Sequence, residues 1–157
     1  TKKTLTRRCT MALSLQEMSD RFEIQDMLYH YADIIDRKAA LELTDIFTPD
    51  AHIDYSAFGG TVGDLSSTID FLKEALPAFS ATQHLNANIQ ITVTGDTASG
   101  RVMCFNPMEM PLGEETQVFM LGLWYVDRYR RTDAGWRISE RKEEKSWVFN
   151  VPDFMAL

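Results

Sequence analysis

A change of hydrophobic periodicity near residue 82 limits the folds that are open to this chain. Before it, apolar residues recur every three or four positions, which is the spacing of amphipathic helices. After it, apolar and polar residues alternate in long runs that are separated by glycine-containing turns, as in antiparallel strands. This separation of helices from strands is typical of α+β domains, so we expect helices packed against the concave face of one curved antiparallel sheet.

The longest helix is predicted from about residue 15 to residue 36. Ser14 and Glu17 match a capping box, in which the two side chains satisfy free backbone amides of the first turn. Asp36 lies at the C-terminal end, where the helix dipole opposes a carboxylate, so we expect another group to hold it there. The predicted apolar stripe of this helix consists of Phe22, Ile24, Met27, Leu28, Tyr31, Ile34 and Ile35.

Two shorter helices and a first strand are predicted next. The first of these helices should end before Pro49, because the residue preceding a proline is pushed out of the helical region. The strand that follows has Tyr55 on its apolar side. The last helix can be capped by Ser66 or Ser67 and is stopped by Pro77. The predicted ranges are 39–47 (helix), 51–57 (strand) and 68–76 (helix).

Four long strands are predicted in the second half, with hairpin turns at residues 94–97 and 132–135. Their ranges are 83–93, 98–106, 116–131 and 136–149. In the third of them, Phe119, Leu121, Leu123 and Tyr125 share one face, and Met120, Trp124 and Val126 share the other. A sheet that is apolar on both faces needs a cover for each, so we expect a homo-oligomer, either a dimer or a trimer.

Size and charge exclude several classes of protein. The 157 residues suffice for one domain, which we expect at residues 11–157, with residues 1–10 as a tail that is native or was added in cloning. A net charge of −7 without a basic stripe argues against nucleic-acid binding. The sequence shows no membrane-spanning run and no secretory signal, and Cys9 and Cys104 fit neither a disulfide framework nor a metal site. We therefore expect a cytoplasmic protein with reduced thiols.

His84 is the candidate catalytic base. It lies at the start of a predicted strand between the amides of Gln83 and Asn86, where its ring can face a cavity while the rest of the strand is packed. A neutral imidazole can accept a proton near neutral pH. His30 and His52 lie on polar sides of their elements and are expected in solvent, as is the charged segment 141–145.

The order of these elements resembles the nuclear transport factor 2-like fold, and the local sequences resemble its SnoaL-like branch of cyclases, dehydratases and isomerases. The resemblance spans nearly the whole domain, from Ser14 to Phe149. It is carried by residues 24–28 with Tyr31 and Asp36, 47–51 with 53–55, 82–84, 95–101, and Tyr129 through Trp136. It implies a cone-shaped, curved sheet that is mainly antiparallel, with some mixed pairing. Together with three N-terminal helices, this sheet encloses a hydrophobic cavity.

The resemblance also implies a set of catalytic residues. Scytalone dehydratase, hexachlorocyclohexane dehydrochlorinase and bile-acid dehydratase share a helix-end aspartate and a strand-start histidine, which correspond here to Asp36 and His84. The bile-acid enzyme is similar at Tyr31 and scytalone dehydratase at Tyr55. In these enzymes a carboxylate holds the imidazole in one tautomer and the phenols donate hydrogen bonds. No cofactor is implied and no metal site is expected.

Other positions depart from those enzymes. Met108 follows Pro107 where scytalone dehydratase has a second histidine, Tyr125 replaces its asparagine, and Asn106 replaces an aspartate of the bile-acid enzyme. The general chemistry therefore transfers but the substrate does not. The predicted substrate-binding residues are Asn88, Asn106, Met108, Phe119, Leu123, Tyr125 and Trp147, with residues 147–154 able to fold over the cavity mouth or a neighbouring molecule.

The leading hypothesis is a cofactor-free lyase or isomerase, preferably a dehydratase, in which His84, oriented by Asp36, removes a proton from a hydrophobic cyclic small molecule. Two alternatives stay open. One is a non-catalytic ligand-binding or dimerising module, since this fold does not fix a function. The other is the small subunit of a ring-hydroxylating oxygenase, which has a similar fold without an active site of its own.

Overall fold

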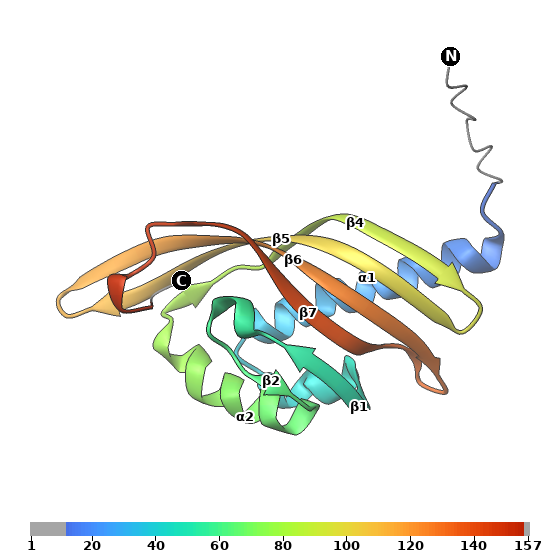
Figure 1. The fold of residues 1–157 in the computed structure, drawn as a ribbon, viewed down its shortest axis with the longest axis horizontal. Coiled ribbons are helices and arrows are strands. Elements are labelled where there is room, and N and C mark those ends of the chain that lie inside the picture. Colours follow the sequence, from blue (N-terminus) through green and yellow to red (C-terminus); the bar gives the residue numbers. More distant parts are fainter. Residues whose placement is uncertain (1–11, 156–157) are drawn as a thin grey trace, which may run out of the picture.

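The structure, a computed structural model, describes residues 12–155, so the predicted tail and Cys9 lie outside the described residues. The helical elements are α1 (Leu15–Asp36), η1 (Ala40–Asp45), η2 (Ser56–Phe58), α2 (Leu65–Ala75), η3 (Leu76–Ala78) and η4 (Asp153–Met155), where η marks a 3₁₀ helix. The strands are β1 (Phe47–Asp54), β2 (Val62–Gly63), β3 (Ala81–Thr82), β4 (Leu85–Thr94), β5 (Thr97–Leu112), β6 (Glu115–Thr132) and β7 (Gly135–Phe149) (Figure 1).

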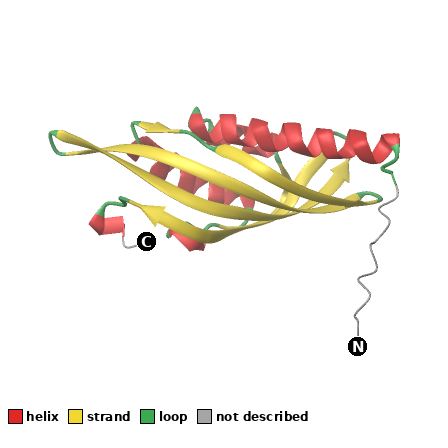
Figure 2. Ribbon diagram, turned by 90° about the horizontal axis from the view of Figure 1, so that it is seen from above, coloured by secondary structure: helices red, strands yellow, loops and turns green. Residues whose placement is uncertain are grey.

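The strands form one curved, mixed sheet in the order β2-β1-β7-β6-β5-β3, and β4 also pairs with β5. All pairs are antiparallel except β1 with β7. The helix α1 runs along one face of this sheet, and α2 packs against β1 (Figures 1 and 2). The predicted α+β class and the meander of four long strands are thus confirmed.

The helix α1 begins and ends where the sequence predicts. Its N-cap is Ser14, whose Oγ accepts a hydrogen bond from the Glu17 N–H at 3.1 Å. Ile24 and Leu28 are fully buried, but Phe22 is 65% exposed, so its assignment to the apolar stripe was wrong. Phe22 precedes Ile24 by two residues, which places the two side chains about 160° apart around the helix.

Other predicted elements differ from the structure in their bounds. The strand predicted at 98–106 continues to Leu112 as part of β5. The predicted helix 39–47 is the short 3₁₀ helix η1, and β1 already begins at Phe47 because its backbone joins β7 at Ile138. The helix α2 begins at Leu65 rather than at residue 68. Its cap is Asp64, whose Oδ1 accepts from the Ser67 N–H at 2.8 Å, and not Ser66 or Ser67. Aspartate is as good an N-cap as serine.

The core fills the space between the helices and the inner face of the sheet. Its largest fully buried apolar side chains include Trp136, Tyr125, Tyr129 and Phe119. Along residues 12–155, none of the helices combines the length and the apolar composition that a membrane crossing requires.

Candidate functional site

His84 and Asp36 lie in direct contact. The His84 Nδ1 is 2.7 Å from Asp36 Oδ1, and the backbone N–H of His84 donates to both carboxylate oxygens at 3.2 and 2.9 Å. The two side chains are 8% and 24% exposed. The partner that a carboxylate at a helix C-terminus requires is therefore the histidine from the opposite half of the chain.

An interruption of the sheet places His84 at this position. The strands β3 and β4 both pair with β5, and the gap between them lies beside Pro107. A proline has no N–H to donate to a neighbouring strand, and here its carbonyl accepts from the Gln83 N–H at 3.1 Å. The next residue, His84, leaves the ladder, so its N–H is free to bind Asp36.

Asn106 contacts the other nitrogen of the imidazole. Its Nδ2 lies 3.1 Å from His84 Nε2, and its Oδ1 accepts from the Thr82 hydroxyl at 3.0 Å. In this arrangement the amide donates to Nε2, so Nε2 carries the lone pair and Nδ1 donates its proton to Asp36. Asp36, His84, Asn106 and Thr82 therefore form one continuous hydrogen-bonded chain, with the basic nitrogen on the side of the cavity.

Three buried tyrosines line the cavity. The hydroxyls of Tyr31 and Tyr55 are 2.9 Å apart, and the ring of Tyr31 meets that of Tyr125 edge to face at 5.7 Å. Burial raises the pKa of all three phenols above its usual value. They therefore remain protonated at neutral pH and can act as hydrogen-bond donors to a bound molecule.

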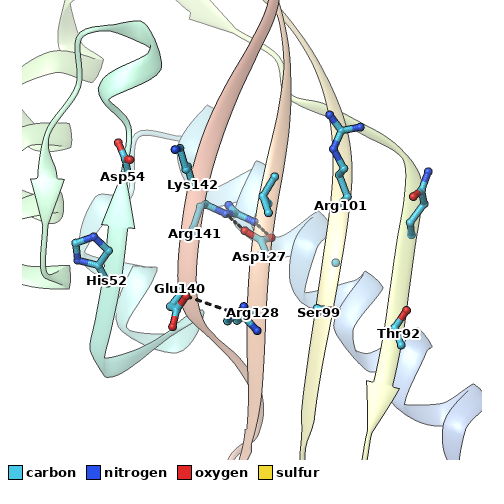
Figure 3. Close-up of a pocket in the computed structure, with 13 residues that line it drawn as sticks. His52, Asp54, Thr92, Ser99, Arg101, Asp127, Arg128, Glu140, Arg141 and Lys142 are labelled. Atoms are coloured by element: carbon cyan, nitrogen blue, oxygen red, sulfur yellow. Dashed lines mark hydrogen bonds and ion pairs between the residues drawn. The ribbon is translucent and has the colours of Figure 1, made fainter.

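Arg141 is fully buried beneath these tyrosines, so the predicted solvent exposure of segment 141–145 was wrong at this residue. Its Nε and Nη2 donate to the two oxygens of Asp127 at 2.8 and 2.7 Å, an ion pair that Figure 3 shows. The guanidinium also stacks over the rings of Tyr31 and Tyr125, at 4.2 and 4.1 Å from their centroids. Arg141, which is fixed by Asp127, thus contacts both rings and holds them in place.

Glu143 is a residue of the cavity that the sequence analysis missed. It lines the same space as His84 and the tyrosines. Burial raises the pKa of its carboxyl to about 8; the positive charge of Arg141 opposes this effect and the negative charge of Asp54 adds to it. At neutral pH the carboxyl is therefore mostly protonated.

The first of two β-bulges in β7 explains why Arg141 and Glu143 face inward. Trp136 and Ile138 are buried, so simple alternation would direct residues 140 and 142 into the core. The register against β6 shifts by one residue at Ser139, which turns Arg141 and Glu143 inward instead. No pattern in the sequence marks this bulge, so Glu143 could not be identified from the sequence.

The cavity has a volume of about 240 Å³ and opens between the inner face of the sheet, α2 and the C-terminal segment. Its wall is apolar apart from the groups described above. The apolar lining consists of Ile35, Phe58, Phe71, Leu72, Ala75, Leu76, Phe79, Met108, Leu121, Leu123 and Met155. Such a space suits a small hydrophobic molecule that presents a few polar atoms.

A larger hollow of about 650 Å³ lies on the outer face of the sheet, across β1, β7, β6, β5 and β4 (Figure 3). Most of its lining side chains are charged or polar, among them the exposed Arg128 and Glu140, which form an ion pair at 3.3 Å, and the buried pair Arg141 and Asp127. His84 and Asp36 do not line it. The smaller inner cavity, which the imidazole of His84 lines, is therefore the better candidate site.

The predicted substrate-binding residues divide into two groups. Asn106, Met108, Leu123 and Tyr125 line the cavity, as do the predicted catalytic residues His84, Tyr31 and Tyr55, while Asp36 lies behind His84. Asn88, Phe119 and Trp147 do not line it.

Local irregularities explain why two of these three side chains lie outside the cavity. Asn88 lies at a bulge of β4 with a positive φ of 47°, which turns its side chain to the outer face near Met103. Trp147 follows a second bulge of β7 and lies on the outer face against Gly122. Phe119 does point inward, but it is fully buried against Phe79 beyond the cavity wall.

Within residues 12–155, no three His, Cys, Asp or Glu side chains lie close enough together to hold a metal ion. His84 and Asp36 are joined to each other and have no third such ligand beside them in this part of the chain. Cys104 is buried, and burial raises the pKa of its thiol to about 12. The polar groups that line the cavity, which are His84, three tyrosines and Glu143, are of the kinds that carry out acid–base chemistry.

Comparisons with known proteins agree with this architecture. The profile of the SnoaL-like domain matches residues 16–142. An uncharacterized protein of Mycobacterium tuberculosis is 46% identical over 133 residues, which cover 85% of this chain and 90% of that protein.

Solved structures are similar as well. A protein from Kribbella flavida is 29% identical with a TM-score of 0.75, over 85% of this chain and 95% of that one. A hexachlorocyclohexane dehydrochlorinase from Novosphingobium barchaimii is 18% identical with a TM-score of 0.74, over 88% of this chain and 94% of that one. The second likeness is one of fold.

Proposed function

Because this chain belongs to the SnoaL-like domain family, and because an aspartate-bound histidine opens into its apolar cavity, we propose that it is a cofactor-free lyase. Its substrate is a hydrophobic, cyclic small molecule, and dehydration is preferred over isomerisation. The observation that carries the proposal is the contact of 2.7 Å between His84 and Asp36 at the edge of the cavity. The structural likeness to a dehydrochlorinase supports an elimination.

His84 is the base in this proposal. Asp36 accepts the Nδ1 proton, which fixes the tautomer and stabilises the imidazolium that forms when Nε2 removes a proton from carbon. Asn106 holds Nε2 in the free protein at 3.1 Å, and a bound substrate replaces this contact. Binding and activation of the base are thereby coupled.

Tyr31 and Tyr55 stabilise the negative charge that develops on the substrate. Removal of a proton next to a carbonyl group places charge on the carbonyl oxygen, and hydrogen-bond donors arranged in advance lower the barrier to that step. The two phenols are joined at 2.9 Å, so one hydroxyl can donate to the other while the second donates to the substrate oxygen. Their raised pKa values keep both protons in place.

The test uses 3-phenylcyclohexanone, a hydrophobic cyclic ketone, in deuterated water. We expect the wild-type protein to exchange the hydrogens next to the carbonyl group, and the variant His84→Ala to lose about 10²- to 10⁴-fold in rate, the usual contribution of a general base. The measurement is exchange followed by NMR, together with the melting temperature of each protein.

His52→Ala is the control, because His52 is exposed on the outer face and does not line the cavity. Exchange at wild-type rate in His84→Ala would discard the mechanism. Binding of the ketone without any exchange would identify a ligand-binding module instead of an enzyme.

A further inference from the structure

Glu143 is not used by the mechanism proposed above, although it faces the same cavity. It lies on β7 opposite Tyr125 of β6, whereas His84 lies beyond β5 at the other side of the sheet. Two strands, β5 and β6, separate the two residues, and the sheet curves around the cavity between them. A molecule bound in the cavity therefore has the imidazole on one side and the carboxyl group on the other.

No side chain of the described residues forms a hydrogen bond or an ion pair with the Glu143 carboxyl. Arg141, two positions earlier on the same strand, directs its Nε and Nη2 to Asp127 instead. Several charged or titratable groups surround Glu143. They are Asp54 of β1, Cys104 of β5, Tyr125 of β6, Arg141 of β7 with its partner Asp127, Tyr31 of α1, Tyr55 next to β1, and His84 with Asp36 across the cavity. The carboxyl is thus left available to a ligand.

We propose that Glu143 is a second catalytic residue, the acid that protonates a departing hydroxyl group, and that the substrates are cyclic β-hydroxy carbonyl compounds. This inference rests on the proposed function, because it needs His84 as the base. Hydroxide is a poor leaving group and needs a proton as the carbon–oxygen bond breaks, whereas a chloride or a carboxylate leaves as a stable anion. An acid opposite the base is required for the first type of substrate and not for the second. The raised pKa of Glu143 supplies that proton at neutral pH.

Atoms and charge are conserved in this elimination. His84 Nε2 takes a hydrogen from the carbon next to the carbonyl group, and the electron pair of that bond becomes the new carbon–carbon double bond. The carbon–oxygen bond breaks, and the oxygen takes the Glu143 proton and leaves as water. The protein is left with an imidazolium and a carboxylate, and transfer of one proton from the first to the second restores both groups.

The test compares two probes on the same ring, 3-hydroxy-5-phenylcyclohexanone and its 3-acetoxy analogue, which form the same enone. In the variant Glu143→Gln we expect elimination of the hydroxyl to fall by about 10²-fold or more, because a general acid contributes at least that much. Elimination of acetate and the exchange of 3-phenylcyclohexanone should stay within a few-fold of wild type. The matched control is Glu144→Gln, since Glu144 binds Arg101 at 3.1 Å on the outer face.

The outcomes separate the two proposals. Loss of both eliminations in Glu143→Gln to the same extent, or loss of neither, overturns the role of Glu143 while His84-dependent exchange still supports the base. Exchange and elimination that do not depend on His84, or a wild type that converts none of the probes, overturn both proposals.

Infrared spectra at neutral pH provide a measurement without substrate. A protonated carboxyl band that is absent in Glu143→Gln and present in Glu144→Gln is expected, and its absence from the wild type would overturn the inference.

Discussion

The buried ion pair of Arg141 and Asp127 determines the charge of the cavity. Both side chains are 0% exposed, and the two hydrogen bonds between them neutralise the guanidinium. A charge that is buried this deeply is stable only when it is paired, so Asp127 is needed for Arg141 to lie under the tyrosines. Burial keeps the proton on Glu143, and the positive charge of Arg141 opposes this effect without an ion pair to the Glu143 carboxyl, because its hydrogen bonds go to Asp127.

The protonated state of Glu143 predicts how stability depends on pH. The pKa of a glutamate in the unfolded chain is about 4.3, while burial raises the pKa of the folded Glu143 to about 8. Between these values the unfolded chain binds fewer protons than the folded protein, so the free energy of unfolding falls as pH rises. We therefore expect Glu143→Gln to stabilise the protein by up to a few kcal/mol at pH 8 and by little near pH 4.

Urea unfolding of wild type and Glu143→Gln at several pH values between 4 and 8 measures this effect, with Glu144→Gln as control. An unchanged difference between the two proteins over the whole range would show that the carboxyl is ionised in the fold.

Asp20 joins α1 to the β6–β7 hairpin. Its Oδ1 accepts from Arg131 at 2.7 Å, from Gln16 at 2.9 Å and from the indole of Trp136 at 3.3 Å. Burial would by itself raise the pKa of this carboxyl, but the hydrogen bonds from Arg131, Gln16 and Trp136 outweigh that effect and the pKa is lowered. The carboxylate therefore fixes the position of the long helix against the sheet.

We expect Asp20→Asn to lower the free energy of unfolding at neutral pH by ~1–3 kcal/mol, since an amide cannot satisfy all three donors equally. The lowered pKa means that the contribution of Asp20 is present above the pKa of the unfolded chain, ~3.9, and is lost as pH falls through the folded pKa. The variant should therefore lose less stability than wild type below pH 4.

Asp96→Asn is the matched control, because Asp96 binds the same arginine at 3.0 Å but its side chain is 83% exposed. It should cost well under ~1 kcal/mol, as surface ion pairs usually do. Equal losses in the two variants, measured by urea unfolding at pH 7 and at pH 4 to 2, would contradict a special role for Asp20.

Considered as a whole, the molecule leaves the outer face of its sheet uncovered. Trp147 is 45% and Phe149 60% exposed at the end of β7, and Val118 of β6 is 47% exposed. Trp147 packs there against Phe105 at a ring distance of 5.9 Å. Apolar groups gathered on one face commonly mark an interface between subunits.

We expect the wild-type protein to form a dimer or trimer through this face, and Trp147→Lys to shift it toward the monomer. Phe22→Lys, which changes an apolar residue of α1 that is 65% exposed, should leave the assembly unchanged. Light scattering at micromolar concentration measures the mass of each protein. A monomeric wild type would refute the expectation.

Much of this protein follows from local patterns in its sequence. The cap at Ser14, the extent of α1 and the hairpin turns depend on neighbouring residues, so they could be predicted without a structure. The proximity of His84 to Asp36 was also expected, but only through the resemblance to known enzymes, since 48 positions separate the two residues.

The features that could not be predicted depend on contacts between distant segments. One extra residue in a strand reverses the direction of every side chain after it, and no local pattern marks Ser139 or the second bulge of β7. For this reason the sequence pattern does not place Arg141 and Glu143 inside the fold or Trp147 on the outer face of the sheet. Periodicity therefore defines the helices and strands of this chain, while pairing across the sheet determines which side chains enter the cavity, because the register of a strand depends on its neighbours.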